Sequence, residues 1–392
     1  MSSAESPGPA SPPPEGVFDI TQYGAIADGK TENSKAFLAT WEAACRNAGN
    51  STFYIPEGTY IVGPISFSGP CYKNQSPEVK IEGTLVAPSS LNSFLNSEWI
   101  EYKNLNGLVL TGRTRVTNFD GQGAVEAWKQ ISCWSSRECK VLITSLKFSN
   151  VSYGTLTNIS MVNSKSFHVS FHESNHITVR NIIITAPGNS PNTDGIHIGR
   201  STNISIVSSA IGVGDDCISI GPGSINITIF DVRCGPGHGL SIGSLGKYKN
   251  EEDVIGITVQ NCTINGTQNG VRVKTWPGSQ ASIASNMTFE DIVMVNVSNP
   301  VIIDQEYCPA SSCDLSKPSL VKLSNISVKN VSGTYNTNSA VTLLCSSNVP
   351  CENIKIIDVN LNNTVSNGST PRQGRLNLKG VINGFQVDNS RF

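Results

Sequence analysis

The amino-acid sequence predicts an all-β protein built as a single solenoid domain. Its main indication is a repeat in which an asparagine precedes a segment of alternating apolar residues, the pattern of strands with one buried face. The repeat begins at Asn150, Asn175, Asn203, Asn226, Asn286, Asn325 and Asn353. Successive starts lie 25, 28, 23, 60, 39 and 28 residues apart, so the interval of 60 fits two coils and that of 39 one coil with an insertion. Such recurrence is typical of stacked repeat proteins.

Length and composition agree with one large domain. The chain has 392 residues, of which 38% are hydrophobic, and a solenoid of this length folds as one unit. Its 28 basic and 30 acidic residues give a net charge of -2, so no overall positive field attracts nucleic acid or another polyanion. No segment approaches the roughly 20 apolar residues of a membrane span. We therefore expect a monomer that binds neither nucleic acid nor membranes.

The two ends of the solenoid need covering. Residues 1–16 are rich in proline and lack the apolar core of a secretory signal, which predicts a flexible extension or cloning remnant before a domain at 17–392. Residues 31–45 form an amphipathic pattern with a threonine or serine at the N-cap. We expect this short helix to cap the N-terminal end of the core.

Four polar clusters interrupt the repeats between residues 192 and 275. They are Asn-Thr-Asp at 192–194, Gly-Asp-Asp-Cys at 214–217, Gly-His-Gly at 237–239 and Arg-Val-Lys at 272–274. Because a solenoid stacks positions that recur once per coil, these clusters should meet in one patch. Singly, each is an ordinary turn signature, but their order and spacing together predict an active site.

The acids suggest the chemistry of that site. Glycoside hydrolysis uses one protonated carboxyl as proton donor and a second carboxylate on the other side of the bond. Repulsion between the adjacent Asp215 and Asp216 should raise the proton affinity of one of them, and Asp194 could serve as general base with the other. Arg272 and Lys274 share one face of a strand and could bind an anionic substrate. Like-charged acids also predict an acidic pH optimum.

Two local expectations follow from strand geometry. Adjacent strand residues point to opposite faces, so Asp215 and Asp216 can both face a cleft only if a bulge or turn interrupts the strand, which Gly214 would permit. His197 lies between two isoleucines and could face the cleft, but a structural role is favoured. Arg200, Lys247 and Lys249 are further candidate cations for an anionic polymer, and for both lysines a solvated surface role is equally plausible.

The motifs resemble those of the plant polygalacturonases, glycoside hydrolases that cleave pectin and fold as right-handed parallel β-helices. The resemblance covers nearly the whole chain after residue 16 and includes segments 18–31, 190–197 and 235–244 besides the clusters. It implies that Asp215 is the proton donor, and that Asp194 and Asp216 position and deprotonate the attacking water with inversion. It further implies that His238 tunes the acid, while substrate is bound by Arg272, Lys274, Tyr307 and Asn192.

Cysteine usage indicates an oxidising compartment. The eleven cysteines fall largely into close pairs, although sequence cannot prove connectivity. The expected pairs are Cys45 with Cys71, Cys133 with Cys139, Cys217 with Cys234, Cys308 with Cys313, and Cys345 with Cys351. Cys262 remains and suits a buried strand thiol. No zinc-type spacing is present, and we expect neither a metal nor another cofactor.

Sequons agree with secretion, which predicts an extracellular protein of the plant cell wall whose signal peptide has been removed. They include Asn150, Asn203, Asn226, Asn286 and Asn325. The same asparagines begin the repeats and could instead form a hydrogen-bonded ladder. We therefore expect only some of them to carry glycans.

Segments 244–251, 271–276 and 303–308 are most similar to pollen-type exopolygalacturonases, which favours release of single galacturonates from the non-reducing end. Endo action remains an alternative because sequence does not show loop positions. Pectate lyase, which uses calcium, and a non-catalytic pectin-binding protein are remoter alternatives. Two features depart from the family: Val273 replaces the usual isoleucine between the cations, and residues 366–392 lack a cysteine pair.

Overall fold

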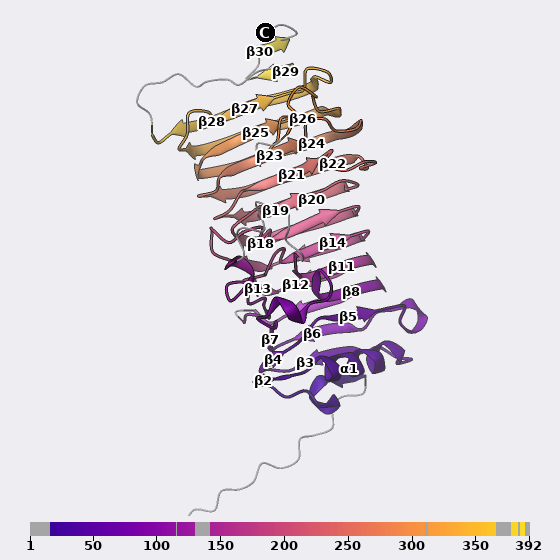
Figure 1. Cartoon of the computed structure of the whole chain (residues 1–392). Helices are drawn as coiled ribbons and strands as arrows, with labels where there is room; N and C mark the ends of the chain where they lie inside the picture. Colours follow the sequence, from indigo (N-terminus) through magenta and orange to yellow (C-terminus); the bar gives the residue numbers. More distant parts are fainter. Residues whose placement is uncertain are drawn as a thin grey trace, which may run out of the picture.

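The computed structural model describes residues 16–114, 116–129, 142–309 and 313–365, together with the backbone of 378–382 and 385–388. The chain winds as a right-handed parallel β-helix whose coils stack from the N-terminal to the C-terminal end (Figure 1). Within the described residues every strand pair is parallel except β29 with β30. This architecture confirms the predicted fold class.

The coils present three faces, and the first carries the candidate site. Its strands are β5 (Ile65–Ser68), β8 (Glu98–Asn106), β11 (Thr144–Ser152), β14 (Val169–His172), β17 (Ile196–Gly199), β19 (Ile218–Ile220), β21 (Leu240–Leu245), β23 (Asn269–Thr275), β25 (Asn299–Asp304) and β27 (Val341–Leu344). Each pairs in parallel with the next along the stack. Residues at matching register positions therefore form rows across successive coils.

The other two faces complete the coils. The second begins with β1 (Val17–Asp19), β3 (Thr52–Ile55), β6 (Glu78–Ile81), β9 (Val109–Gly112), β12 (Thr155–Thr157) and β15 (Asn175–Arg180). The third begins with β2 (Asp28–Glu32), β4 (Thr59–Ile61), β7 (Thr84–Val86), β10 (Phe119–Asp120), β13 (Ser160–Val162) and β16 (Ile183–Thr185). Later coils span both faces with the long strands β18 (Thr202–Gly212), β20 (Ile225–Cys234), β22 (Val254–Asn265), β24 (Ser282–Val297), β26 (Val321–Tyr335) and β28 (Cys351–Asn363). Strands β29 (Leu378–Ile382) and β30 (Phe385–Asp388) follow β28.

Inward-facing side chains fill the solenoid from end to end, mostly isoleucine, valine, leucine and phenylalanine. Alternation along most of the described strands sends every second residue into this core, as in β9 and β20. Aromatic rings stack along the axis where coils repeat them: Tyr102 lies 5.6 Å from Phe148, which lies 5.0 Å from Phe171, measured between ring centroids. The continuous core gives the site face a rigid support.

Asparagines at the corners between faces form the predicted ladder. Asn150, Asn226, Asn325 and Asn353 have positive φ, a conformation that asparagine tolerates better than most residues. Their Nδ2 atoms donate to the Oδ1 atoms of the asparagines one coil earlier, at 2.7–3.2 Å. The ladder gives these asparagines a structural role, and the glycosylation of individual sequons stays a prediction.

The predicted capping helix is present as α1 (Ser34–Arg46), at the N-terminal end of the stack (Figure 1). Its buried Phe37 and Trp41 pack against the core aromatics, with Trp41 5.0 Å from Phe67 between ring centroids. The expected threonine or serine N-cap is wrong, because the N-cap is Asn33. The Asn33 amide does not cap the helix, since it bonds to the backbone of Ile26 instead.

Disulfides follow the spacing of the cysteines. The pairs Cys45–Cys71, Cys217–Cys234, Cys308–Cys313 and Cys345–Cys351 are formed as predicted. Cys262 is a buried free thiol, also as predicted. The predicted pair of Cys133 and Cys139 lies outside the described residues, as does the predicted extension apart from Gly16.

Short 3-10 helices occupy the connections: η1 (Ile20–Tyr23), η2 (Tyr72–Asn74), η3 (Leu91–Ser93) and η4 (Ala127–Lys129). Among the described residues, no helix combines the length and apolar character needed to cross a bilayer.

Candidate active site

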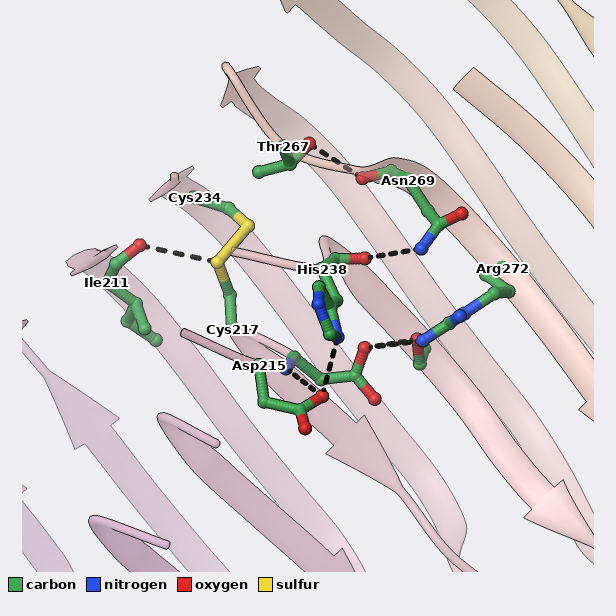
Figure 2. The surroundings of a disulfide bond; sticks show 10 residues. Ile211, Asp215, Cys217, Cys234, His238, Thr267, Asn269 and Arg272 are labelled. Carbon is green, nitrogen blue, oxygen red and sulfur yellow. Dashed lines mark hydrogen bonds and ion pairs between the residues drawn. A yellow bond between two sulfur atoms is a disulfide. The ribbon is translucent and has the colours of Figure 1, made fainter. Parts of the chain in front are cut away.

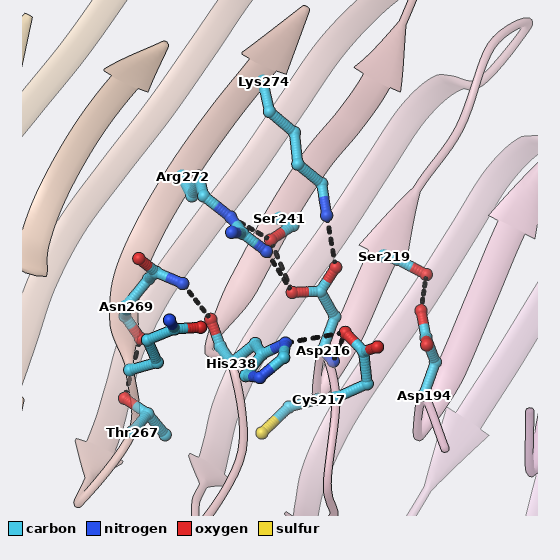
Figure 3. A network of polar contacts seen from close by, with 12 residues as sticks. Asp194, Asp216, Cys217, Ser219, His238, Ser241, Thr267, Asn269, Arg272 and Lys274 are labelled. Carbon is cyan, nitrogen blue, oxygen red and sulfur yellow. Dashed lines mark hydrogen bonds and ion pairs between the residues drawn. The ribbon is translucent and has the colours of Figure 1, made fainter. Parts of the chain in front are cut away.

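The polar clusters predicted from the sequence meet on the first face of the solenoid (Figure 3). Asp194 lies just before β17, Asp215 and Asp216 just before β19, and His238 just before β21. Arg272 lies on β23, in register with Ser241 on β21. Stacking of the coils thus brings together residues that are up to 80 positions apart in sequence, counted from Asp194 to Lys274.

The Asp pair lies on a bend between β18 and β19, as predicted. A Cβ atom at Gly214 would lie 2.0 Å from the backbone oxygen of Ser190, so only glycine allows the two segments to pack so closely. The hydroxyl of Thr193 accepts a hydrogen bond of 3.0 Å from the Gly214 amide. The Asn-Thr-Asp and Gly-Asp-Asp turns are therefore fixed to each other.

Asp216 is the buried centre of an ion-pair network. Its side chain is 2% exposed, and it accepts from Arg272 Nη2 at 2.9 Å and from Lys274 Nζ at 2.8 Å. The Ser241 hydroxyl donates a third bond at 2.7 Å. Burial alone would raise the pKa of Asp216, but Lys274 and Arg272 hold that pKa below its ordinary value. Asp216 is therefore a stable anion and a weak base.

Asp215 is the more accessible acid, with 24% of its side chain exposed. Its Oδ1 atom lies 2.9 Å from Nδ1 of His238 and accepts from the backbone amide of Asp216 at 2.8 Å. His238 is held over it because the His238 amide donates to the Asp215 carbonyl at 2.7 Å. The arrangement leaves a carboxyl at the surface of the site with an imidazole as its hydrogen-bond partner.

Asp194 is buried and has no cation in direct contact within the described residues. Burial raises the pKa of Asp194 well above its ordinary value, and the charges of Asp215 and Asp216 raise it further. The Ser219 hydroxyl donates to Asp194 Oδ2 at 2.6 Å, which offsets part of that rise. Repulsion among the three acids therefore raises the pKa of Asp194, whereas at Asp216 the two cations outweigh this repulsion.

The two cations that were expected to bind an anionic substrate also pair with an acid of the site. Arg272 and Lys274 are 9% and 6% exposed, and both already pair with Asp216. Each retains donors beyond those bonds, since guanidinium has five N–H groups and ammonium three. Tyr307 lies beside them, with its ring centroid 5.3 Å from Lys274 Nζ and 5.9 Å from Arg272 Cζ.

Other predicted residues have mixed placements. Asn192 donates to the Ser166 hydroxyl at 3.3 Å, so part of its polar capacity is used inside the turn. Arg200 pairs with Glu252 and Glu173, which removes it as a free cation. His197 bonds to Ser219 at 2.8 Å and thereby joins the acid network.

Sequence reasoning missed three residues that support the acids. Ser219 donates to Asp194, and Ser241 donates to Asp216. The sequence pattern could have indicated both serines, because they are register partners on successive coils and Ser241 is in turn the register partner of Arg272 on the next coil. The third is the buried His168, whose Nε2 accepts from the Ser164 amide, so that its Nδ1 donates to the Asp194 carbonyl at 3.1 Å. Burial lowers the pKa of His168 to about 4, which keeps this ring neutral.

Asp215, Asp216 and His238 place their ligand atoms within 4.8 Å of one another, close enough for a metal ion. Both carboxylate oxygens of Asp216 already face Arg272 and Lys274, so a cation here would compete with two fixed positive charges. The donor set therefore fits a proton-transfer site better than a divalent metal centre.

The disulfide between Cys217 and Cys234 anchors the segment that follows the Asp pair (Figure 2). Replacing both cysteines with serine should lower the free energy of unfolding by about 3 kcal/mol, the value for a loop of this size. It should also lower the catalytic rate by roughly tenfold or more, because small displacements of reacting groups are costly. Denaturant unfolding and initial rates test both effects. The matched control replaces Cys45 and Cys71, near the N-terminal cap, with serine. This double variant should have a lower free energy of unfolding and an unchanged catalytic rate. Equal catalytic rates in the two double variants would contradict the prediction.

Comparisons with known proteins show the family to which the chain belongs. The model of the Glycosyl hydrolases family 28 matches residues 45–373. An exopolygalacturonase from Platanus acerifolia is 44% identical over 371 residues, covering 95% of this chain and 96% of that protein. A polygalacturonase from Gossypium hirsutum is 41% identical over 371 residues, covering 94% of this chain and 89% of that protein.

Solved structures share the fold at lower identity. An endo-xylogalacturonan hydrolase from Aspergillus tubingensis has a TM-score of 0.74 at 22% identity, covering 94% of this chain and 100% of that one. A hyperthermoactive exopolygalacturonase from Thermotoga maritima has a TM-score of 0.69 at 19% identity, covering 95% and 93%. The chain therefore belongs to family 28 of the glycosyl hydrolases, the family of the polygalacturonases that its motifs resemble.

Proposed function

We propose that the protein hydrolyses α-1,4-galacturonosyl bonds of polygalacturonate, with residues 17–392 as one catalytic β-helix. The observation that carries this proposal is the division of three neighbouring acids into different environments. Asp215 is accessible and contacts His238, Asp216 is buried with two cations, and Asp194 is buried without one. Acids held in different environments are the arrangement that acid–base hydrolysis of a glycoside needs.

The environments suggest the role of each acid. Asp215 donates its proton to the glycosidic oxygen as the bond to the leaving sugar breaks, with His238 hydrogen-bonded to it. Water attacks the anomeric carbon from the other side, which gives inversion. Asp216 orients this water as a fixed anion, and Asp194 takes its proton because its raised pKa makes it the stronger base. The rate should therefore fall as the pH drops below the pKa of Asp194, where this base is protonated.

Exo action is the mode that the relatives favour. Curated relatives from Platanus acerifolia, Arabidopsis thaliana and Zea mays are exopolygalacturonases, at 41–44% identity. We accordingly propose stepwise release of galacturonate from pectin in the plant cell wall, by a secreted monomer. The four disulfides in the described residues support an extracellular location.

The test is to follow the products of polygalacturonate by chromatography over time, while recording absorbance at the band of unsaturated uronides. Saturated monomer from the earliest times is the expected result. A ladder of saturated oligomers would show endo action, and unsaturated products would show a lyase. No product at all would identify a binding protein or a different substrate.

A second cationic position supports binding of a polymer with a carboxylate on every sugar. Lys247 is exposed, and its Nζ lies 5.4 Å from the ring centroid of Trp276 and 5.3 Å from that of Tyr248. Trp276 contacts Tyr307 edge to face, with 5.5 Å between ring centroids. Through these two rings, the exposed Lys247 is linked to the buried Lys274 beside Tyr307. No acid pairs with Lys247 in the part of the chain that the structure describes.

Replacing Lys247 with glutamine should raise KM about two- to fivefold with kcat unchanged, the size expected of one exposed charge pair. The effect should fade at high salt, because exposed charges are screened. Initial rates at two ionic strengths measure it. Lys249→Gln is the control for a general change in charge, and an equal rise in KM for that variant would refute a specific contact at Lys247.

A further inference from the structure

A chain of hydrogen bonds runs from His197 to the carboxylate of Asp194. His197 Nδ1 lies 2.8 Å from Ser219 Oγ, and that oxygen lies 2.6 Å from Asp194 Oδ2. Figure 3 shows Ser219 directed at Asp194. No hydrogen bond to the other oxygen, Oδ1, occurs within the described residues. One oxygen of this acid is therefore tied to the protein and the other is left for a ligand.

The direction of each bond follows from its chemistry. In the state in which Asp194 acts as the base, its carboxylate is ionised and only accepts, so the single proton of Ser219 is directed to Asp194. His197 must then donate from Nδ1 to the serine oxygen, which fixes the tautomer and leaves Nε2 without a proton. Burial lowers the pKa of His197 to about 4, so the ring is neutral over the ordinary working range. These two hydrogen bonds form a relay of uncharged donors, from His197 through Ser219 to the carboxylate of Asp194.

The imidazole is held firmly in place. Its centroid lies 4.9 Å from that of Phe167, with the two planes 30° apart. A Cβ atom at Gly221 would lie 3.3 Å from His197 Cε1, so the glycine makes room for the ring. Phe167 and Gly221 together therefore hold the imidazole of His197 in one orientation.

The adjacent coils repeat this arrangement with one difference. Arg272 Nε donates to Ser241 Oγ at 3.1 Å, and Ser241 donates to Asp216 Oδ1 at 2.7 Å. Ser219 and Ser241 are register partners on β19 and β21. Each buried acid thus receives a serine hydroxyl that is backed by a nitrogen donor. The donor is a cation behind Asp216 and a neutral ring behind Asp194.

We infer that His197 and Ser219 are positioning residues that orient Asp194 without neutralising its charge. Arg272 and Lys274 turn Asp216 into a weak base, whereas an uncharged relay fixes Asp194 and leaves it strongly basic. The relay also determines which oxygen takes the proton, because Oδ2 accepts from Ser219 and Oδ1 has no hydrogen bond within the described residues. This assignment deepens the proposed function and rests on it for the identity of the base. The sequence favoured a structural role for His197, and this inference adds a positioning role to it.

The kinetic test uses variants that separate the donor from the packing. His197→Phe keeps a ring against Phe167 but removes the donor, and His197→Asn restores an N–H near the Nδ1 position. Ser219→Ala breaks the relay at its centre. On polygalacturonate, His197→Phe and Ser219→Ala should lower kcat roughly 10- to 100-fold, the cost of a misplaced reacting group, with KM within about twofold. His197→Asn should lose less kcat than His197→Phe: its decrease in log kcat should be at most half as large.

Ser170→Ala is the matched control, because Ser170 is the register partner of His197 one coil earlier and belongs to the same row. It should match the wild type in both constants. Equal losses in His197→Phe and His197→Asn would show a packing role, and a rise in KM alone would show a substrate contact. Either result overturns the inference.

A readout without substrate distinguishes this inference from the proposed function. Ser219 stabilises the ionised form of Asp194, so Ser219→Ala should move the titration of that carboxyl to higher pH. Carbon-13 NMR of the carboxyl carbons measures the titration, with Asp194→Asn used for assignment, and nitrogen-15 spectra report the tautomer of His197. A shifted titration and an Nδ1–H tautomer support the relay even if polygalacturonate proves not to be the substrate. An unshifted titration or an Nε2–H tautomer overturns the relay even in an active polygalacturonase.

Discussion

Asparagine in place of Asp215 should lower the rate of polygalacturonate hydrolysis by about 10² to 10⁴-fold, the usual contribution of a general acid. The amide keeps the size of the side chain and can still meet the Asp216 amide with its oxygen, but it has no proton to give to the leaving oxygen. Because the side chain is 24% exposed and belongs to a bend, the fold should tolerate the change. The loss should appear in kcat, since the proton moves in the transition state.

Single-turnover or initial-rate assays on polygalacturonate measure this loss, with far-ultraviolet circular dichroism as the check on folding. The control is Asp358→Asn, the same chemical change at an exposed corner residue with positive φ, where asparagine is equally suited. That control should keep the wild-type rate. Retention of more than about a tenth of the activity by Asp215→Asn would assign proton donation to another group.

The fold and the acids could be predicted because both depend on recurrence along the chain. Asparagine tolerates the positive φ at a corner, so Asn150, Asn226 and Asn325 begin coils at readable intervals. The polar clusters occupy corresponding places on neighbouring coils, and stacking alone brings Asp194 and Asp216 close together. The bend at Gly214 followed from the requirement that two adjacent acids share one side of a strand.

What the sequence could not predict is how each polar group is used. Asn33 could cap a helix or bond to a neighbouring loop, and the tertiary fold decides between them by placing the backbone of Ile26 within hydrogen-bond distance of the Asn33 amide. Ser219 and Ser241 look like ordinary outward-facing strand residues until the acids are seen beside them. The partner of Arg272 was equally open, because a cation that could meet substrate also forms an ion pair with the buried carboxylate of Asp216.

The three acids therefore illustrate how neighbours on a rigid frame acquire different properties. All three are aspartates in turns before strands of one sheet. Among the described residues, Asp216 pairs with both cations, Asp194 accepts from the neutral Ser219 hydroxyl, and Asp215 pairs with the half-buried imidazole of His238. The serine that donates to each buried acid is repeated from one coil to the next, but the group behind it differs: His197 behind Ser219 and Arg272 behind Ser241. This difference separates the stronger base, Asp194, from the weaker base, Asp216.

Removal of the Asp216 carboxylate should have the largest effect on stability. Asp216→Ala leaves Arg272 and Lys274 buried without their partner, and breaking a buried ion pair in this way costs about 3–5 kcal/mol. The pKa of Asp216 is lowered in the folded protein, so its stabilising contribution is present above the unfolded pKa and is lost as pH falls. The difference between variant and wild type should accordingly be full near pH 7 and shrink at strongly acidic pH.

Denaturant unfolding with the disulfides intact, at several pH values, measures this difference. Asp215→Asn is the matched control and should lie within about 0.5 kcal/mol of the wild type, as is usual for changes outside buried networks. A triple variant with Asp216→Leu, Arg272→Met and Lys274→Met should regain most of the stability, because replacing a whole buried charge network is often neutral or favourable. It should remain inactive. A loss below about 1 kcal/mol in Asp216→Ala, or one that does not depend on pH, would mean that solvent rather than Asp216 balances the two cations.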